Sequence, residues 1–347
     1  MRSCVVLLAL LTAHAAAQTG LTSDNALDLE LEGYVYLRYT IYGQEGSIPD
    51  DAFELRRAGL KTDFDLSSSL SGQLQLETRT DEVFLKDCYA AWAPADYAGL
   101  TLGLFKAPFC LNTLTGSWDL YSPEHSLGDA ELSDLYYAGR DLGAMLTVHP
   151  YGPAQLMLCV SNGGAPELEP EDRELQYTAR AEAEFPGNVT LGLGGTRLRL
   201  GQEDPESVEG YVRSDPQTAW GVDGRWSRPL GNRTEAGLTA EYVEADNWSE
   251  ADVLDGAEAP LLKDIWARGR LTWYPRFGGH VERIDLALDY EAIDAGSGIG
   301  GHRMLTPAVT VWPADTWRVR LAGMTHSFDG ASDEQYSDIV LELGAVF

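Results

Sequence analysis

Apolar and polar residues alternate strictly over the last stretch of the chain, SDIVLELGAVF. Ile339, Leu341, Leu343, Ala345 and Phe347 share one parity. A period of two predicts a β-strand with one apolar face. Because this face continues to an aromatic last residue, we expect the strand to be paired along its whole length.

The same period recurs along the chain in sixteen runs that are separated by turn residues. Early runs are ALDLELEGYVYLRYTIY and FELRRAGLKTDFDL, and the parity of the second changes between Arg56 and Ala58, which predicts a β-bulge. Short Pro/Gly turns such as HPYGPA alternate with longer, mostly acidic connections such as SNGGAPELEPEDR. An even strand number with this alternation predicts a 16-stranded antiparallel transmembrane β-barrel.

The two faces of these strands favour a barrel over a secreted β-sandwich. Aromatic residues fall near strand ends on the apolar face, as in an interfacial girdle. They are Trp92, Tyr177, Phe185, Trp220, Trp226, Tyr242, Trp273, Tyr290 and Trp317. The opposite face is charged, and we expect it to line the lumen. Its acids include Glu77, Asp87, Glu182, Glu184, Asp285 and Asp289, and its bases include Arg180, Arg225, Arg268, Arg270, Arg283, Arg318 and Arg320.

The first residues, MRSCVVLLALLTAHAAAQ, combine one arginine, a short apolar run and small residues before Gln18. This is the pattern of a secretory signal peptide, and the apolar run is too short for a transmembrane helix. We therefore expect residues 1–17 to be a signal peptide and residues 18–347 to form one β-barrel.

Residues 110–139 form the longest gap between predicted strands. The gap contains many apolar and aromatic residues, including Trp118 and Tyr121, together with His125. Such a composition predicts a long third loop that folds into the lumen as a constriction. The alternative is an external cap that packs on neighbouring loops.

Composition argues against several classes of function. The chain has 54 acidic and 25 basic residues, which disfavours nucleic acid as a partner. It has no Gly-x-Ser-x-Gly motif, and no two histidines have a short metal-binding spacing. We therefore expect no catalytic residues, no metal and no cofactor.

Three motifs, FELRRAGLKTDFDL, LKDCYAAWAPADYAGLTLGLFKAPF and GRDLGAML, occur in this order over residues 33–165. Their order and spacing resemble the family of phosphate-selective porins O and P. The resemblance implies a trimeric sixteen-stranded barrel in the outer membrane of a Gram-negative-type bacterium. It also implies inserted loops whose basic side chains bind anions and let them pass. The terminal strand that ends at Phe347 resembles the signal that the barrel assembly machinery recognises.

Carried over by position, the resemblance assigns an anion path to Arg56, Arg57, Lys106 and Arg140, with Arg38 as a weaker match. Cations that line a narrow polar pore favour anions. The alternative is that each arginine pairs with a carboxylate and holds the shape of the barrel. The chain departs from the family in having few lysines and many acids, so phosphate selectivity is not carried over.

We therefore expect a passive outer-membrane porin for small hydrophilic solutes or ions. Its expected partners are outer-membrane lipid and two further copies of the chain in a homotrimer. The alternative is a plugged structural or adhesion barrel whose acidic surface loops bind divalent cations.

Overall fold

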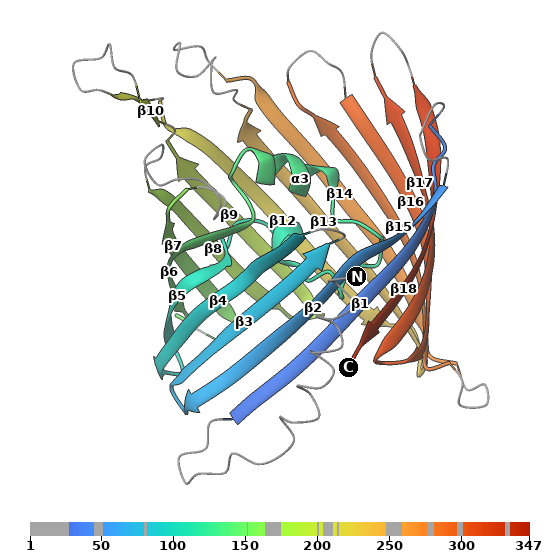
Figure 1. Ribbon diagram of the computed structural model, residues 1–347, viewed down its shortest axis with the longest axis horizontal. Helices are drawn as coiled ribbons and strands as arrows, with labels where there is room; N and C mark the ends of the chain where they lie inside the picture. The colour runs from blue at the N-terminus through green and yellow to red at the C-terminus, as the bar shows by residue number, and fades with distance from the viewer. Residues whose placement is uncertain are drawn as a thin grey trace.

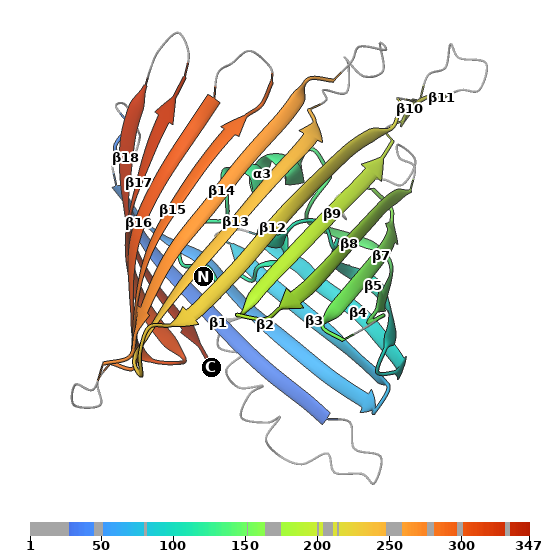
Figure 2. The ribbon, with the colours of Figure 1, turned by 180° about the vertical axis from the view of Figure 1, so that it is seen from behind.

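In the computed structural model, sixteen antiparallel strands form a closed barrel (Figures 1 and 2). The structure describes residues 28–44, 51–79, 82–150, 152–163, 175–199, 201–203, 211–213, 215–247, 259–275, 281–296, 301–329 and 334–347. The predicted signal peptide and much of the long acidic connections lie outside these residues. The predicted fold class, a 16-stranded antiparallel barrel, is confirmed.

The barrel strands follow one another around the wall, each beside its neighbours in sequence. They are β1 (Asp28–Ile41), β2 (Asp51–Ser67), β3 (Leu70–Arg79), β4 (Glu82–Ala95), β5 (Ala98–Lys106), β6 (Arg140–Val148), β7 (Ala154–Ser161), β8 (Gln176–Phe185), β9 (Val189–Leu198), β12 (Gln217–Pro229), β13 (Thr234–Asp246), β14 (Leu261–Trp273), β15 (Arg283–Asp294), β16 (Gly301–Ala314), β17 (Trp317–Phe328) and β18 (Gln335–Val346). Strands β10 (Gly201–Glu203) and β11 (Tyr211–Arg213) form a separate two-stranded ribbon.

Pairing of the last strand with the first closes the barrel. The register of β18 on β1 runs from Val346 opposite Tyr34 to Ile339 opposite Ile41. Beyond it, the backbone N–H of Phe347 donates to the Gly33 carbonyl at 2.8 Å, and the Gly33 N–H donates to the Phe347 carbonyl at 2.7 Å. The prediction that the last strand is paired to its final residue is therefore confirmed. Closure leaves no unpaired strand edge for lipid to contact.

The wall is polar inside and apolar outside. On β17, Arg318 and Arg320 are 0% and 1% exposed, whereas Leu321 is 53% exposed. On β18, Glu342 is buried and Leu341 is exposed. Large apolar side chains face out on strand after strand, and this is the surface that a lipid-embedded barrel presents. No helix of the described residues is both long and apolar enough to span a membrane.

One predicted irregularity is confirmed and two features were not predicted. The register of β1 on β2 passes from Arg57 to Leu55, so Arg56 is the extra residue of a bulge. The β10–β11 ribbon lies in a connection that was predicted to be a plain loop. Segment 110–139 contains two helices, α2 (Leu111–Leu114) and α3 (Leu127–Asp134). Elements this short carry too few residues for a periodic pattern to be recognised.

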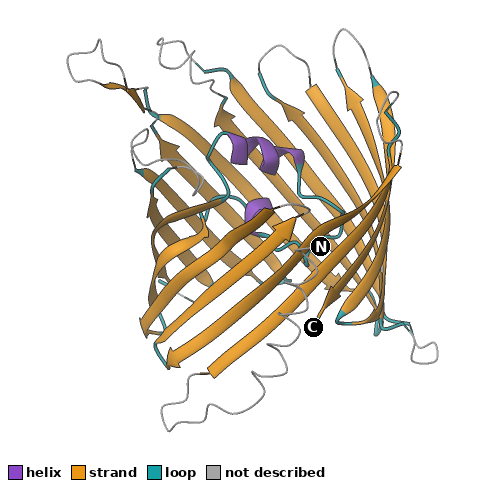
Figure 3. Ribbon diagram, in the orientation of Figure 1, coloured by secondary structure: helices purple, strands orange, loops and turns teal. Residues whose placement is uncertain are grey.

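Apolar residues of segment 110–139 and of the residue before it pack against the barrel wall. Phe109, Leu132 and Tyr137 are fully or almost fully buried, in one cluster with Val243 of β13 and Leu262 of β14. Both ribbon views draw α3 between the near and far strands, and Figure 3 shows the helices surrounded by strands. The cluster fixes one side of the segment against β9 and β12 to β15.

Gly194 of β9 shows how closely this contact is made. A Cβ atom at Gly194 would lie 1.9 Å from the Phe109 carbonyl oxygen, whereas one at Gly195 would lie no closer than 3.7 Å to its nearest neighbour. We expect Gly194→Ala to destabilise the protein by about 1–3 kcal/mol, since backbone must move to relieve the overlap. Thermal unfolding in detergent measures the effect, with Gly195→Ala as the control that changes stability little. Equal midpoints for the two variants would contradict the packing described here.

Candidate functional site

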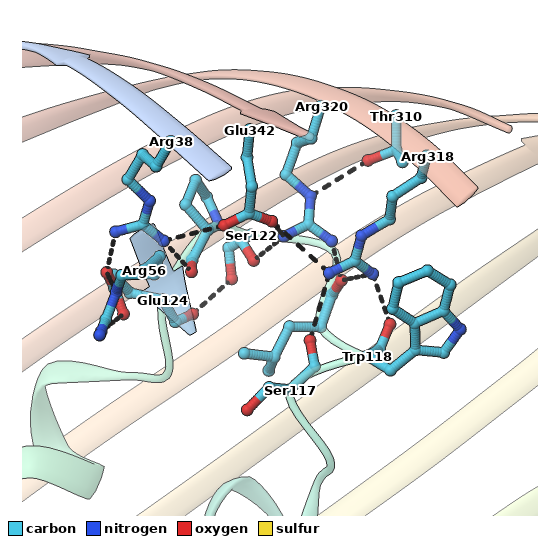
Figure 4. A network of polar contacts seen from close by, with 12 residues as sticks. Arg38, Arg56, Ser117, Trp118, Ser122, Glu124, Thr310, Arg318, Arg320 and Glu342 are labelled. Atoms are coloured by element: carbon cyan, nitrogen blue, oxygen red, sulfur yellow. Dashed lines mark hydrogen bonds and ion pairs between the residues drawn. The ribbon is translucent and has the colours of Figure 1, made fainter. Parts of the chain in front are cut away.

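Two arginines of β17 bind the backbone of segment 110–139 (Figure 4). Arg318 donates to the carbonyls of Ser117 and Trp118, and Arg320 donates to the carbonyls of Leu120 and Ser122. The bond from Arg320 to Ser122 measures 2.7 Å. Residues 115–126 lie between α2 and α3 and have few backbone partners of their own, so the guanidinium donors replace the missing backbone hydrogen bonds.

Glu124 is the acidic side chain through which the segment meets β1 and β2. Arg56 donates to its two oxygens at 2.8 and 3.2 Å, and Arg38 donates to one of them. Arg38 also donates to the Pro123 carbonyl at 2.8 Å and to Glu342 at 3.0 Å. Burial alone would raise the pKa of Glu124, but the charge of Arg38 and the hydrogen bonds of Arg56 lower it to about 2. Glu124 is therefore a carboxylate at any ordinary pH.

Four of the five predicted anion-path residues come together on the segment. Besides Arg38 and Arg56, Arg57 donates to the Ser117 hydroxyl, and the Lys106 ammonium donates to the carbonyls of residues 113 and 115. Arg140 does not join them. It makes a bidentate ion pair with Asp87 of β4, with contacts of 2.8 and 3.1 Å.

The three side chains predicted for the constriction, Trp118, Tyr121 and His125, have different surroundings. The ring of Trp118 lies 5.3 Å from that of Trp312 and 4.6 Å from the Arg318 guanidinium. Tyr121 accepts a hydrogen bond from Arg270 and also faces the guanidinium of Arg268. These contacts pair aromatic faces with cations.

His125 has a buried environment instead. Its Nδ1 lies 3.2 Å from the Asn112 carbonyl oxygen and 3.6 Å from Asp129. Burial lowers the pKa of His125 to about 4, with Asp129 acting in the opposite direction. The imidazole is therefore neutral at neutral pH, and His125 adds no charge to the segment.

Sequence reasoning placed Arg318 and Arg320 on the polar face but did not include them in the site. The alternation in WRVRLAG gives their face, but it does not show which segment they contact. We call Arg38, Arg56, Arg57, Lys106, Arg318 and Arg320 the basic cluster. Its members come from β1, β2, β5 and β17 and all bind residues 113–124.

Three buried carboxylates on the opposite wall were also missed as part of the site. Glu241 of β13 accepts from the Asn112 N–H at 3.1 Å, and Glu291 of β15 accepts from the Gly128 N–H at 2.9 Å. Asp264 of β14 lies against Gly128. We call these three residues the acidic trio. Within the part of the chain that the structure describes, no ion pair joins them to a cation, so they contrast with the basic cluster.

A chamber of about 1100 Å³ adjoins the segment on the side of the short turns. Its lining includes Trp118, Tyr121 and Trp312, four arginines (Arg225, Arg268, Arg270 and Arg283) and the acids Asp119, Glu182, Glu184 and Asp315. A smaller cavity of about 250 Å³ lies near the other ends of β3, β4 and β6, beside Lys86 and Arg140. Among the described residues, no group of three or more His, Cys, Asp or Glu side chains has the geometry to hold a metal ion.

Comparisons with known proteins agree with the barrel fold. The sequence profile described as phosphate-selective porin O and P matches residues 23–214. A search of curated proteins finds no match. The fold is similar to the outer membrane channel DcaP of Acinetobacter baumannii, with a TM-score of 0.61, 14% identity and coverage of 94% of this chain and 99% of that one.

Two further solved structures share the fold. OprB of Pseudomonas putida gives a TM-score of 0.62 at 10% identity, covering 93% of this chain and 95% of that one. OmpT of Vibrio cholerae, in its trimer form, gives a TM-score of 0.59 at 14% identity, covering 93% of this chain and 100% of that one. At these identities the likeness establishes the fold and nothing finer.

The arginine contacts lead to a prediction about stability. Arg320→Met removes the donors to two segment carbonyls and breaks a buried pair with Glu342, which typically costs about 3–5 kcal/mol. We expect a lower thermal midpoint and new protease cleavage between residues 115 and 126. The matched control is Arg303→Met, which breaks an exposed pair with Asp329. The segment would not depend on Arg320 if both variants resisted protease equally.

A further prediction concerns the pH dependence of stability. Because folding lowers the pKa of Glu124 from 4.5 to about 2, its charge stabilises the folded state fully above about pH 4.5. That contribution declines as the pH falls towards 2. The difference in thermal midpoint between wild type and Glu124→Gln should be constant from about pH 7 to pH 5 and then shrink. The control is Glu131→Gln, an exposed residue of α3. A difference that stays constant down to about pH 2 would contradict the assignment.

Proposed function

Since the chain belongs to the family of phosphate-selective porins O and P, we propose that it is a passive diffusion channel for small hydrophilic solutes and ions, constricted by segment 110–139 and favouring anions at that constriction. The family and the barrel fold make it a porin of a Gram-negative outer membrane. Flow follows the gradient, and no catalytic step takes part.

The contacts of segment 110–139 support its role as the constriction. It binds β17 through Arg318 and Arg320, and it binds β1 and β2 through Glu124. On the other side it binds Glu241 of β13 and Glu291 of β15. All these partner side chains project from inward-facing positions on distant parts of the wall. Contacts with buried side chains on separate parts of the wall support a constriction over an external cap.

The basic cluster is the observation that carries the proposed anion preference. Its six cations surround residues 113–124, where their ion-pair partners are Glu124 and Glu342, with Glu54 at 3.6 Å from Arg38. Cations therefore outnumber their carboxylate partners around residues 113–124, whereas the four arginines that line the chamber are matched by four acids. An excess of fixed positive charge in a narrow pore lowers the free energy of an anion there.

Oligomeric state and assembly are part of the same proposal. One similar structure is a trimer form, and the outward apolar faces could contact either lipid or another subunit. We propose a homotrimer, which chemical cross-linking in detergent tests. Residues 1–17 would direct export, and Phe347, 53% exposed at the end of β18, would be read by the barrel assembly machinery.

Reversal potential in a planar bilayer with a salt gradient tests the preference. We expect an anion-directed potential for wild type and a shift towards zero for Arg56→Gln, whose side chain remains partly exposed to the lumen. A unit charge about 4 Å from an ion changes the free energy of that ion by about 1 kcal/mol in water. We therefore expect the variant to change the ratio of anion to cation permeability by about fivefold.

The control for this experiment is Arg303→Gln, since Arg303 faces outward and is exposed. A cation-directed potential in wild type would refute the anion preference and would show that the acidic residues determine the charge preference of the pore. Absence of current from folded, inserted protein would refute the channel and favour the plugged barrel.

A further inference from the structure

His302 and His326 meet on the inner face of the barrel, at the end opposite to Phe347. His302 is the second residue of β16, and His326 lies near the end of β17. The Nε2 atom of His302 lies 3.0 Å from the Nδ1 atom of His326. The two residues are 24 positions apart in sequence, so no short histidine motif reveals the pair.

Aromatic neighbours hold both imidazole rings in place. Phe328 stacks on His302 with ring centroids 4.1 Å apart, and Tyr336 stacks on His326 at 4.6 Å. His326 is 8% exposed. Rings that are fixed before a ligand arrives lose little conformational entropy when it binds.

A carboxylate lies behind His326. Its Nε2 atom is buried without a hydrogen-bond partner and lies 3.8 Å from the Asp338 carboxylate. Asp338 is fixed in turn, because its other oxygen accepts a hydrogen bond from the Gly43 N–H at 2.9 Å. A carboxylate facing the far nitrogen of a histidine is the usual outer partner of a metal-binding imidazole.

We propose that His302 and His326 bind one divalent transition-metal ion, such as Cu²⁺ or Zn²⁺, at the inner rim of the barrel. Imidazole nitrogens suit these ions. Two metal–nitrogen bonds of about 2.0–2.1 Å, at an angle between the square (90°) and the tetrahedral (about 109°), place the nitrogens about 2.8–3.4 Å apart. The observed separation of 3.0 Å lies in that range.

In the free protein the contact between the two rings is a hydrogen bond, so one of the two facing nitrogens carries a proton. On metal binding that proton moves to the other nitrogen of its own ring, so neither ring loses a proton overall. The metal takes the lone pairs of His302 Nε2 and His326 Nδ1, so each neutral ring carries its proton on its other nitrogen. For His326 that nitrogen is Nε2, which faces Asp338. Water fills the remaining coordination positions, since the described residues bring no third ligand to the pair. The bound ion adds positive charge to the inner face of a strongly acidic chain.

Copper(II) titration of the purified full-length barrel, without a histidine tag, tests the proposal. Electron paramagnetic resonance reports how many nitrogens bind the ion. We expect one Cu²⁺ per chain with two nitrogen ligands, and a loss of affinity of at least tenfold in His302→Gln and in His326→Gln. Asp338→Asn should weaken binding by about 10- to 100-fold, as for other outer partners of metal-bound histidines. These readouts do not depend on conduction, so they stand apart from the test of the channel.

The matched control is His149→Gln, because His149 lies exposed in a turn at the other end of the barrel. Heat-modifiable migration on gels checks that every variant is folded. Equal Cu²⁺ affinity and the same nitrogen signal in the double variant His302→Gln/His326→Gln would overturn the proposal. A signal from oxygen ligands alone in wild type would also overturn it and would assign the copper to carboxylates.

Discussion

Arginine side chains that project inward from β17 and donate to backbone carbonyls are the interaction on which the rest of the interior depends. Residues 117–124 lie between the helices α2 and α3. Because they belong to neither helix, no backbone N–H group of the described residues donates to their carbonyls. Arg318 and Arg320 supply donors from a rigid strand. These bonds hold the segment where Trp118 packs against Trp312 and where Glu124 pairs with Arg38 and Arg56. Trp118 and Trp312 in turn line the chamber. An arginine suits this task because its planar fork reaches two acceptors at once.

The barrel could be predicted because its evidence is local and repeated. Each strand carries its own period of two, and the bulge at Arg56 appears in the sequence as a change of parity. The contacts of the interior are different in kind. Arg318 and Leu120 are separated by 198 positions, and the sequence around either residue does not predict the contact between them. The basic cluster was found in part, at Arg38, Arg56, Arg57 and Lys106, through a family resemblance and not through periodicity.

The interior separates charge in a way that composition does not reveal. The chain as a whole has a formal net charge of −29, yet cations predominate where β1, β2, β5 and β17 meet residues 113–124. The acidic trio lies across the segment on β13 to β15, where Glu241 and Glu291 accept hydrogen bonds from the backbone N–H groups of Asn112 and Gly128. Different groups therefore hold the two sides of one segment: arginine and lysine side chains bind its carbonyls on one side, and acidic side chains bind its N–H groups on the other.

Single-channel conductance of a variant in which residues 115–125 are replaced by a short Gly/Ser linker tests the central claim most directly. The linker keeps α2, α3 and their apolar contacts but removes the residues that the arginines bind. If the segment narrows the pore, the folded variant conducts several times more current than wild type at the same salt concentration. Equal conductance of the two proteins would show that these residues do not limit flow, and the account of the constriction would be wrong.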